Sequence, residues 1–267
     1  MIWLRSFAFN LAFYAILIGY MLVAPPLFLL PRRWGWHVVK AWARSSLWAC
    51  RVIAGIRTEF RGLDRIPKGA LLVAAKHQSL WETFALITVF DDATYILKRE
   101  LLWIPVFGWY AAKFRMIPVR RGAGSASIRS LVRRVREELA HGRQILIFPE
   151  GTRRPPGAPP AYRHGIVRLY TQLDVPCLPV ALNSGLFWPR RRFLRRPGTI
   201  VAEFLEPIRP GLDGDSFAAL LQSRIEDASN ALLAEGLRQF PTYGDQSPAG
   251  FPAKCDHMPH VTPRLDR

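Results

Sequence analysis

The chain has 267 residues, of which 50% are hydrophobic, and 37 Lys and Arg against 20 Asp and Glu give it a formal net charge of +17. This length suits one sizeable domain with appendages, and this charge favours a polyanionic partner, either nucleic acid or an anionic membrane. The three cysteines are far apart without Cys-x-x-Cys spacing, and no His-Glu-x-x-His pattern occurs. The sequence therefore indicates neither a disulfide framework nor a metal centre.

The N-terminal segment carries no charged residue from Phe7 to Leu30. As a helix rising ~1.5 Å per residue, this run is long enough to cross a bilayer core of ~30 Å, although Pro25 and Pro26 should end the helix at Ala24. A cleaved signal peptide and a buried core helix are competing interpretations. The apolar stretch is long for a signal peptide, and two prolines after Ala24 make a poor cleavage site. We therefore predict a membrane anchor.

The segment after the anchor is expected to be helical from Arg32 to about Ile53, and we assign residues 1–54 to the anchor and this helix. Basic residues fall on one helical face and apolar residues on another: Lys40, Arg44 and Arg51 against Trp34, Val38 and Trp42. Tryptophan and basic residues beside an anchor are typical of an element in the membrane interface. An ordinary amphipathic helix that covers the core has the same pattern, so both interpretations stay open. Positive charge after the anchor predicts that the rest of the chain faces the cytoplasm.

The main domain, predicted over residues 55–240, alternates strand-like and helix-like segments. The predicted strands span 57–61, 71–75, 116–119, 144–148, 179–182 and 199–204. The predicted helices span 83–90, 127–140 and 217–237. Such alternation is typical of an α/β domain. Residues 241–267 are rich in Pro and Gly without a period, and we predict that they form a disordered tail.

The stretch from 71 to 83 places a histidine between a buried strand and a helix, where α/β folds often place chemistry. Glu82 follows His77 by five positions, about 140° away on an ideal helix, so the two side chains can meet only if the backbone turns between them. In that geometry the carboxylate would fix the tautomer of the imidazole and raise its basicity. The pattern Ser79-x-x-Glu82 before an apolar run is also a capping box without any catalytic role. Both interpretations remain open from these residues alone.

A second polar cluster, Glu150-Gly151-Thr152-Arg153, directly follows a predicted buried strand. Glycine permits close approach of the backbone to a ligand, and the planar guanidinium of Arg153 suits a phosphate. A plain turn from strand to loop, with a surface ion pair, would have the same sequence.

Two further groups of arginines could bind anions. Arg120 and Arg121 follow another predicted strand, and the neighbouring glycines are only a weak signal for a nucleotide loop. The segment from Phe187 to Arg196 interleaves arginines with aromatic residues. It could bind nucleic acid or lipid, or could be an ordinary exposed loop.

Taken together, these patterns resemble the glycerolipid acyltransferase family, and most closely its bacterial 1-acylglycerol-3-phosphate acyltransferases. The resemblance covers about residues 71–180 and rests on four motifs in the family's order: His77-x-x-x-x-Glu82, Phe114 with Arg120, Phe148 to Arg153, and Val175-Pro176 with Pro179-Val180. Two positions depart from the family pattern. Glu82 stands where the family usually has aspartate, and Lys76 stands where it often has asparagine.

The resemblance implies an α/β sheet flanked by helices and the transfer of a fatty acyl group to the sn-2 hydroxyl of lysophosphatidic acid, which yields phosphatidic acid. It makes His77 the base and Glu82 its orienting partner. It places five residues at the glycerol phosphate of the acceptor: Arg120, Glu150, Gly151, Thr152 and Arg153.

The same resemblance implies membrane lipids as partners and an inner-membrane location, with no metal, no cofactor and no nucleic acid. Acyl-CoA or acyl carrier protein would be the co-substrate. Glycerol 3-phosphate or another lysophospholipid is the alternative acceptor. A non-catalytic, basic module that binds lipid or nucleic acid at the membrane is the alternative from another class.

Overall fold

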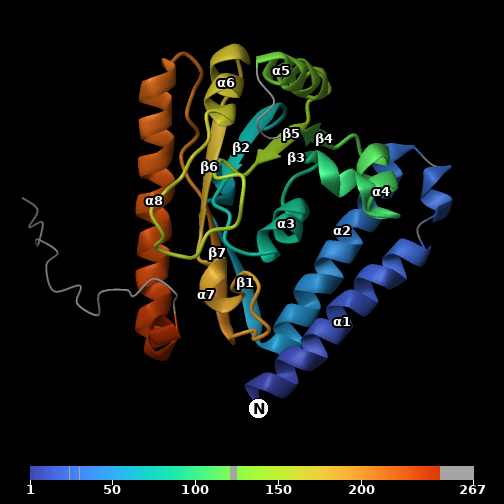
Figure 1. Cartoon of the computed structure of the whole chain (residues 1–267), viewed down its shortest axis with the longest axis vertical. Helices are drawn as coiled ribbons and strands as arrows, with labels where there is room; N and C mark the ends of the chain where they lie inside the picture. The colour runs from blue at the N-terminus through green and yellow to red at the C-terminus, as the bar shows by residue number, and fades with distance from the viewer. Residues whose placement is uncertain (24, 30, 121–124, 247–267) are drawn as a thin grey trace, which may run out of the picture.

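The computed structural model describes residues 1–23, 25–29, 31–120 and 125–246, which form one seven-stranded sheet covered by helices on both faces (Figure 1). The strands are β1 Ile56–Arg61, β2 Leu71–Ala75, β3 Ala93–Lys98, β4 Ile117–Val119, β5 Gln144–Ile147, β6 Cys177–Leu182 and β7 Gly198–Phe204. Their order is β1-β7-β6-β2-β5-β3-β4. All neighbours are parallel except β6 and β7. The carboxyl ends of β2, β5, β3 and β4 therefore share one edge of the sheet.

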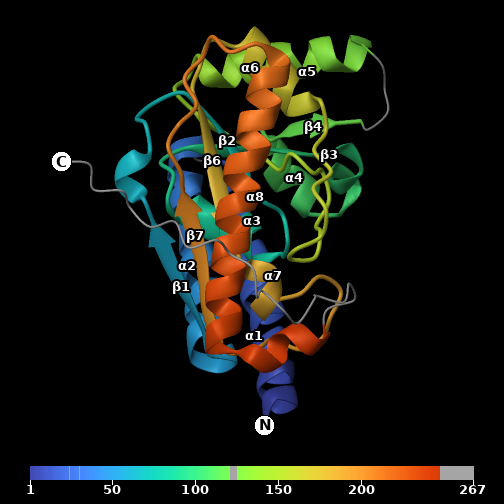
Figure 2. The same cartoon turned by 90° about the vertical axis from the view of Figure 1, so that its left-hand side faces the viewer.

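The helices form a layer on each face of the sheet. Their bounds are α1 Ile2–Val23, α2 Arg32–Ala49, α3 Trp81–Ala85, α4 Phe107–Lys113, α5 Ser125–Leu139, α6 Gly165–Gln172, α7 Ser184–Phe187 and α8 Gly214–Gln239. Figure 2 shows α8 running along the sheet on the side away from α1 and α2. Asp213 starts α8, because its side chain accepts the N–H groups of Asp215 and Ser216 at 3.0 Å, which are donors without an intrahelical partner.

The central strands β2, β5 and β6 are buried at every residue. Apart from Gln144 at the start of β5, their sequences are therefore continuous apolar runs rather than alternating patterns. In β2, Leu71 and Val73 pack into the core beneath α1, α2 and α3. Leu72 and Ala74 pack into the opposite core with α5, α6 and α8. This alternation divides the core into two layers on either side of the sheet.

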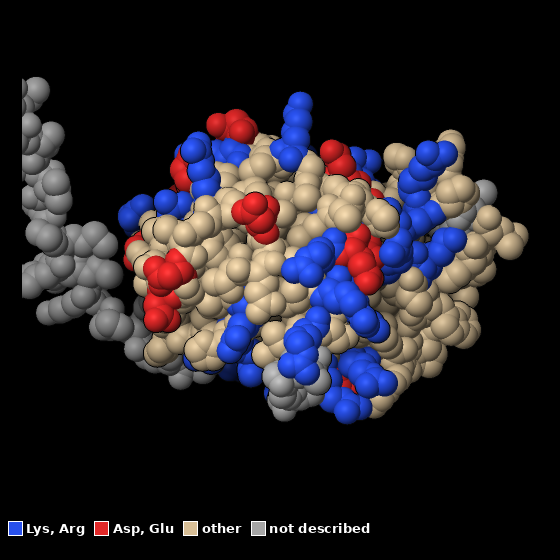
Figure 3. All heavy atoms as spheres, turned by 90° about the horizontal axis from the view of Figure 1, so that it is seen from above, with Lys and Arg blue, Asp and Glu red and all other residues tan. Residues whose placement is uncertain are grey.

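Helix α5 shows the amphipathic pattern expected of a covering helix. Val132, Val135 and Leu139 are buried against the sheet. Its outer face carries exposed arginines: Arg129, Arg133, Arg134 and Arg136. Figure 3 looks onto the end of the molecule where α5 and α6 lie and shows more basic than acidic side chains there.

Helices α1 and α2 pack against each other and against the same face of the sheet as α3. Arg5 Nε donates to Ile53 O at 2.9 Å, and Tyr20 lies 3.1 Å from Ser45, hydroxyl to hydroxyl. Phe9 meets Trp188 edge to face, with ring centroids 5.1 Å apart. Helix α1 is long and apolar enough to cross a membrane, and only 17% of its most apolar window is buried. That low burial argues against the interpretation of α1 as a core helix.

The α/β fold class predicted from the sequence is confirmed, and every predicted strand is present within a few residues. The helix predicted over 83–90 is shorter than expected, because α3 ends at Ala85 and continues as a 3₁₀ turn, Leu86–Thr88. The hydroxyl of Thr88 donates to Ala85 O at 2.7 Å, a local bond that competes with a regular helix. Residues Pro241–Gln246, the start of the predicted tail, form a 3₁₀ helix, and 247–267 lie outside the described residues.

Candidate active site

His77 lies just beyond the carboxyl end of β2, and Phe148 lies just beyond that of the parallel neighbour β5. Their rings stack with centroids 3.9 Å apart and planes inclined by 14°. Phe148 stacks in turn on Tyr95 of β3, at 6.0 Å. Three neighbouring strands thus hold the imidazole in one orientation at the sheet edge where α/β folds bind ligands.

The predicted pair of His77 and Glu82 is formed. Nδ1 of His77 lies 2.9 Å from Oε1 of Glu82, whose side chain is fully buried, while the His77 side chain is 13% exposed. An ionised carboxylate only accepts hydrogen bonds, so Nδ1 carries the proton and Nε2 presents its lone pair. This is the tautomer that a general base requires at Nε2.

The turn between the strand and α3 also contains the predicted capping interaction. Ser79 Oγ accepts the N–H of Trp81 at 3.2 Å. Oε1 of Glu82 accepts the N–H groups of Gln78 and Ser79 at 2.7 and 2.6 Å. The same oxygen therefore caps the turn and binds His77, so the two interpretations of Glu82 left open by the sequence are compatible.

The other oxygen of Glu82 is held by the start of α7, which follows β6 on the opposite side of β2 from Phe148. Ser184 Oγ donates to Oε2 at 2.8 Å. Beside it, the N–H of Gly185 donates to the side-chain oxygen of Gln78 at 3.0 Å. Both oxygens of Glu82 are thus engaged, and its carboxylate cannot rotate away from His77.

A buried ion-pair cluster, Lys76, Glu150 and Glu226, supports the backbone of the histidine. The ammonium of Lys76 lies 3.0 Å from Glu150 and 2.6 Å from Glu226, and the side chains of Lys76 and Glu150 are 2% and 0% exposed. Burial raises the pKa of Glu150, while Lys76 opposes that shift. Oε2 of Glu150 accepts the N–H of His77 at 3.4 Å, and His77 O accepts the N–H of Arg154 at 2.8 Å. The cluster therefore holds the N–H of His77, while the backbone of Arg154 holds its carbonyl oxygen.

Gly151 to Arg153 form the turn after β5. Gly151 has a φ of +65°, a left-handed conformation that favours glycine, and its N–H donates to Phe148 O at 2.9 Å. Arg153 is half-buried beside Thr152, and burial lowers the pKa of its guanidinium while Glu82 opposes that shift. Arg190 Nη1 donates to Arg153 O at 2.9 Å, so the arginine-rich 190–192 segment lies against this turn.

Arg120 follows β4 at the same edge of the sheet, but β5 and β3 separate β4 from β2. Its side chain is exposed, and among the described residues the structure records no contact between it and His77 or Arg153. The alternative, Arg121, lies outside the described residues.

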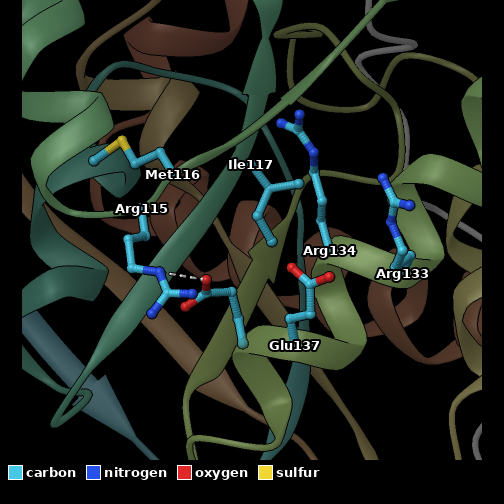
Figure 4. Close-up of a pocket in the computed structure, with 7 residues that line it drawn as sticks. Arg115, Met116, Ile117, Arg133, Arg134 and Glu137 are labelled. Atoms are coloured by element: carbon cyan, nitrogen blue, oxygen red, sulfur yellow. Dashed lines mark ion pairs between the residues drawn. The ribbon is translucent and has the colours of Figure 1, made fainter.

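A cavity of about 380 Å³ lies between α5 and the start of β4, away from His77. Arg115, labelled in Figure 4, forms an ion pair with Glu138 at 2.9 Å. None of the predicted site residues lines this cavity. The candidate site is therefore the open sheet edge around His77. Within the described ranges, no group of three or more His, Cys, Asp or Glu residues could hold a metal ion.

Sequence reasoning did not identify several residues that contact the His77–Glu82 pair or belong to the ion-pair cluster beside it. Ser184 follows β6, and Glu226 lies in α8, so neither stands at a local spacing from His77 that a motif could contain. Lys76 was noted only as a departure from the family pattern. Phe148 was part of a motif, but nothing in its spacing indicated the ring stacking.

Comparison with known proteins identifies the family to which the chain belongs. The sequence model of the family described as "Acyltransferase" matches residues 57–183, which contain His77, Glu82 and the 150–153 turn. Over 198 residues the chain is 38% identical to a 1-acyl-sn-glycerol-3-phosphate acyltransferase of Pseudomonas aeruginosa, an alignment that covers 74% of this chain and 77% of that one. This chain belongs to the acyltransferase family. The predicted enzyme class is thereby confirmed, and the alternative of a non-catalytic binding module is excluded.

Two other relatives add detail about the family and its fold. A lyso-ornithine lipid O-acyltransferase of Pseudomonas aeruginosa is 35% identical over 105 residues, covering 39% of this chain and 40% of that one. A crystal structure of a 1-acyl-sn-glycerophosphate (LPA) acyltransferase from Thermotoga maritima superposes with a TM-score of 0.74 at 22% identity, covering 88% of this chain and 98% of the other. The second comparison confirms the acyltransferase fold for nearly the whole chain.

Proposed function

We propose that this acyltransferase transfers a fatty acyl group from a thioester to the sn-2 hydroxyl of lysophosphatidic acid and so forms phosphatidic acid. The observation that carries the proposal is the contact of 2.9 Å between Nδ1 of His77 and the buried Glu82. It leaves Nε2 as a base at the open edge of the sheet. The name of the 38% identical Pseudomonas relative supports lysophosphatidic acid as the acceptor.

In the proposed reaction, Nε2 of His77 removes the proton of the acceptor hydroxyl as its oxygen attacks the thioester carbonyl. Glu82 holds the ring and stabilises the imidazolium that forms. The carbon–sulfur bond then breaks, and the thiolate leaves with the proton returned by Nε2. A positioned general base contributes roughly 10²–10⁴-fold to the rate. The thioester is already activated, so these residues need no cofactor for the transfer.

The acceptor phosphate is proposed to bind at the 151–153 turn. Arg153 offers a planar, permanently charged fork that suits a phosphate, and Gly151 lets the backbone approach it closely. Arg120 follows β4, further along the same edge of the sheet, and in this proposal it approaches the acceptor phosphate from that side. The family resemblance implies Glu150 at the phosphate as well, but its carboxylate is buried against Lys76 and the N–H of His77. In this proposal Glu150 therefore positions the histidine.

The N-terminal helices are proposed to hold the enzyme on the membrane. Helix α1 is tied to the catalytic domain near both of its ends: Ser6 Oγ accepts the N–H of Arg195 at 2.9 Å, and Met21 O accepts the hydroxyl of Tyr110 at 3.2 Å. Its outward residues are large, apolar and more than half exposed: Trp3, Leu4, Phe7, Leu11, Tyr14, Ile18, Leu22 and Val23. A helix bound lengthwise to a soluble domain, with one apolar face outward, fits one leaflet better than a span.

We extend this proposal to the domain organisation. Residues 1–54 form the membrane-binding part and 55–240 the catalytic domain, which faces the cytoplasm at the inner membrane. The net charge of +17 attracts the enzyme to anionic lipid. The enzyme can then take up its acceptor from the bilayer and release its product into the bilayer without leaving the membrane surface.

An acyl-transfer assay on the full chain tests the proposal. Each acceptor is offered with acyl-CoA and with acyl carrier protein as donors: lysophosphatidic acid, glycerol 3-phosphate, a lyso-ornithine lipid and other lysophospholipids. We expect the highest kcat/KM with lysophosphatidic acid and a product acylated at the sn-2 oxygen. A preparation that acylates another acceptor more efficiently would replace the proposed acceptor. No transfer to any of them would overturn the mechanism.

A further inference from the structure

The segment between β3 and β4 exposes an unusual amount of aromatic surface. It spans residues 99–113, that is, the 3₁₀ helix Arg99–Trp103 (η5), the turn after it and α4, and its three most exposed apolar side chains point outward. Trp103 is 73% exposed, Ile104 48% and Trp109 65%. Grouped apolar side chains of this size mark an interaction surface in a folded protein.

The backbone of this segment is built to present them. Val106 has a φ of +65°, which is a genuine outlier for a β-branched residue. Gly108 packs so closely that a Cβ there would lie 2.0 Å from Leu102 O, and its N–H donates to Ile104 O at 2.9 Å. Such strain persists only where the surroundings enforce it and is characteristic of functional segments.

The segment is also joined to the end of α1. Tyr110 Oη donates to Met21 O at 3.2 Å, and its ring lies 5.1 Å from that of Phe28. Lys113 Nζ donates to Phe28 O at 3.0 Å. Figure 1 shows α4 beside the end of α1 that is far from the N-terminus. At this end of α1, and just after it, further large apolar side chains are exposed: Leu22, Val23 and Leu29.

We propose that η5 and α4 form a second membrane contact, in which Trp103, Ile104 and Trp109 enter the interface of an anionic bilayer. Tryptophan prefers this interface, because its apolar ring can be buried among the lipids while its N–H stays hydrogen-bonded to water. Arg99, which is exposed at the start of the segment, supplies positive charge for anionic headgroups, whereas Lys98 is ion-paired with Glu100 at 3.5 Å.

This contact lies where the enzyme needs it. The segment leaves the carboxyl end of β3, and that edge of the sheet also carries His77. Together with α1, the contact would hold the catalytic edge against the lipid surface. Its role in presenting a lipid acceptor rests on the proposed function, but the membrane contact itself does not.

The test compares the full chain with the double variant Trp103→Ala/Trp109→Ala. Binding is measured to vesicles of phosphatidylethanolamine with and without phosphatidylglycerol. The control is Leu63→Ala/Leu212→Ala, which removes exposed apolar residues (48% and 39%) elsewhere on the surface. We expect the tryptophan variant to bind anionic vesicles about tenfold more weakly and the control to bind normally. Restoring aromatic residues, as Trp103→Phe/Trp109→Phe, should recover much of the affinity.

Activity separates this inference from the proposed function. The tryptophan variant should show a raised KM for acceptor in vesicles but unchanged kcat/KM for a short-chain acceptor in monomeric solution. Vesicle affinity within twofold of the unmodified chain would overturn the membrane contact, whatever the activity. Loss of turnover on the monomeric acceptor, with weakened vesicle binding, would instead show that the substitutions damage the catalytic domain, which also overturns it.

Discussion

Substitution of Lys76 by methionine tests whether the buried ion-pair cluster positions the catalytic histidine. The ammonium of Lys76 lies 3.0 Å from Glu150 and 2.6 Å from Glu226. At an effective dielectric of about 20, these distances correspond to a gross attraction of roughly 5–6 kcal/mol per contact. Desolvation offsets most of it, and removing one partner of such a buried pair typically costs about 3–5 kcal/mol. For a chain of this size, that lowers Tm by roughly 6–20 °C.

The same substitution should reduce turnover by more than the stability loss explains. Without Lys76, Glu150 is no longer held where it accepts the N–H of His77, so the ring loses its support. We expect kcat to fall about tenfold or more at a temperature where the variant is folded, with little change in the KM of the acceptor. A purely structural role would leave kcat unchanged under those conditions.

Two comparisons sharpen this test. Lys76→Met/Glu226→Gln removes one of the two carboxylates that lose Lys76 as their partner and should regain part of the lost Tm. Lys68→Met removes an exposed lysine elsewhere and should alter neither Tm nor kcat. If Lys76→Met kept both the Tm and the kcat of the unmodified chain, the positioning role assigned to the cluster would be refuted.

Three other predictions follow from the site and the packing. Glu82→Gln keeps the caps but removes the charge that stabilises the imidazolium, so turnover should fall heavily at unchanged Tm. Glu82→Asp should keep appreciable activity. A fully active Glu82→Gln variant would contradict the catalytic role of the His77–Glu82 pair. Burial raises the pKa of Asp92, but the hydrogen bond from Arg32 and the charge of Arg143 outweigh it and hold that pKa below its ordinary value. Its stabilisation is therefore present above about pH 4 and lost as pH falls through the folded pKa, so the Tm deficit of Asp92→Asn should be full at pH 7 and shrink towards pH 3. Alkaline carbonate should leave the full-length chain in the membrane fraction, and its release would contradict the anchoring role of Ile2–Val23.

The parts of the fold that could be predicted are those whose pattern is local. Strands β2, β5 and β6 are buried on both faces, so each is a short apolar run that needs no partner to be recognised. Strand β3 was missed because Thr94 is polar although buried, and because acidic residues at 91 and 92 precede it. Its position between β5 and β4 is decided by long-range pairing that no sequence window contains.

The candidate site divides in the same way. His77 and Glu82 are five residues apart, and a turn between a strand and a helix is enough to bring them together. The groups that hold them come from distant elements: Ser184 contacts Glu82 over 102 positions, and Glu226 contacts Lys76 over 150. Parallel strands explain why such groups meet, since each crossover returns the chain to the same edge. The pairing of particular side chains there depends on register, which the sequence alone does not show.

The most direct test of the account is the rate of acyl transfer by His77→Ala. The full chain and the variant are assayed with lysophosphatidic acid and the preferred thioester donor, and Tm and vesicle binding are measured on the same preparations. Loss of the general base should lower kcat by at least ~10²-fold, with Tm and vesicle binding maintained. A folded, membrane-bound His77→Ala that keeps most of its activity would contradict the proposal that Nε2 of this histidine removes the acceptor's proton.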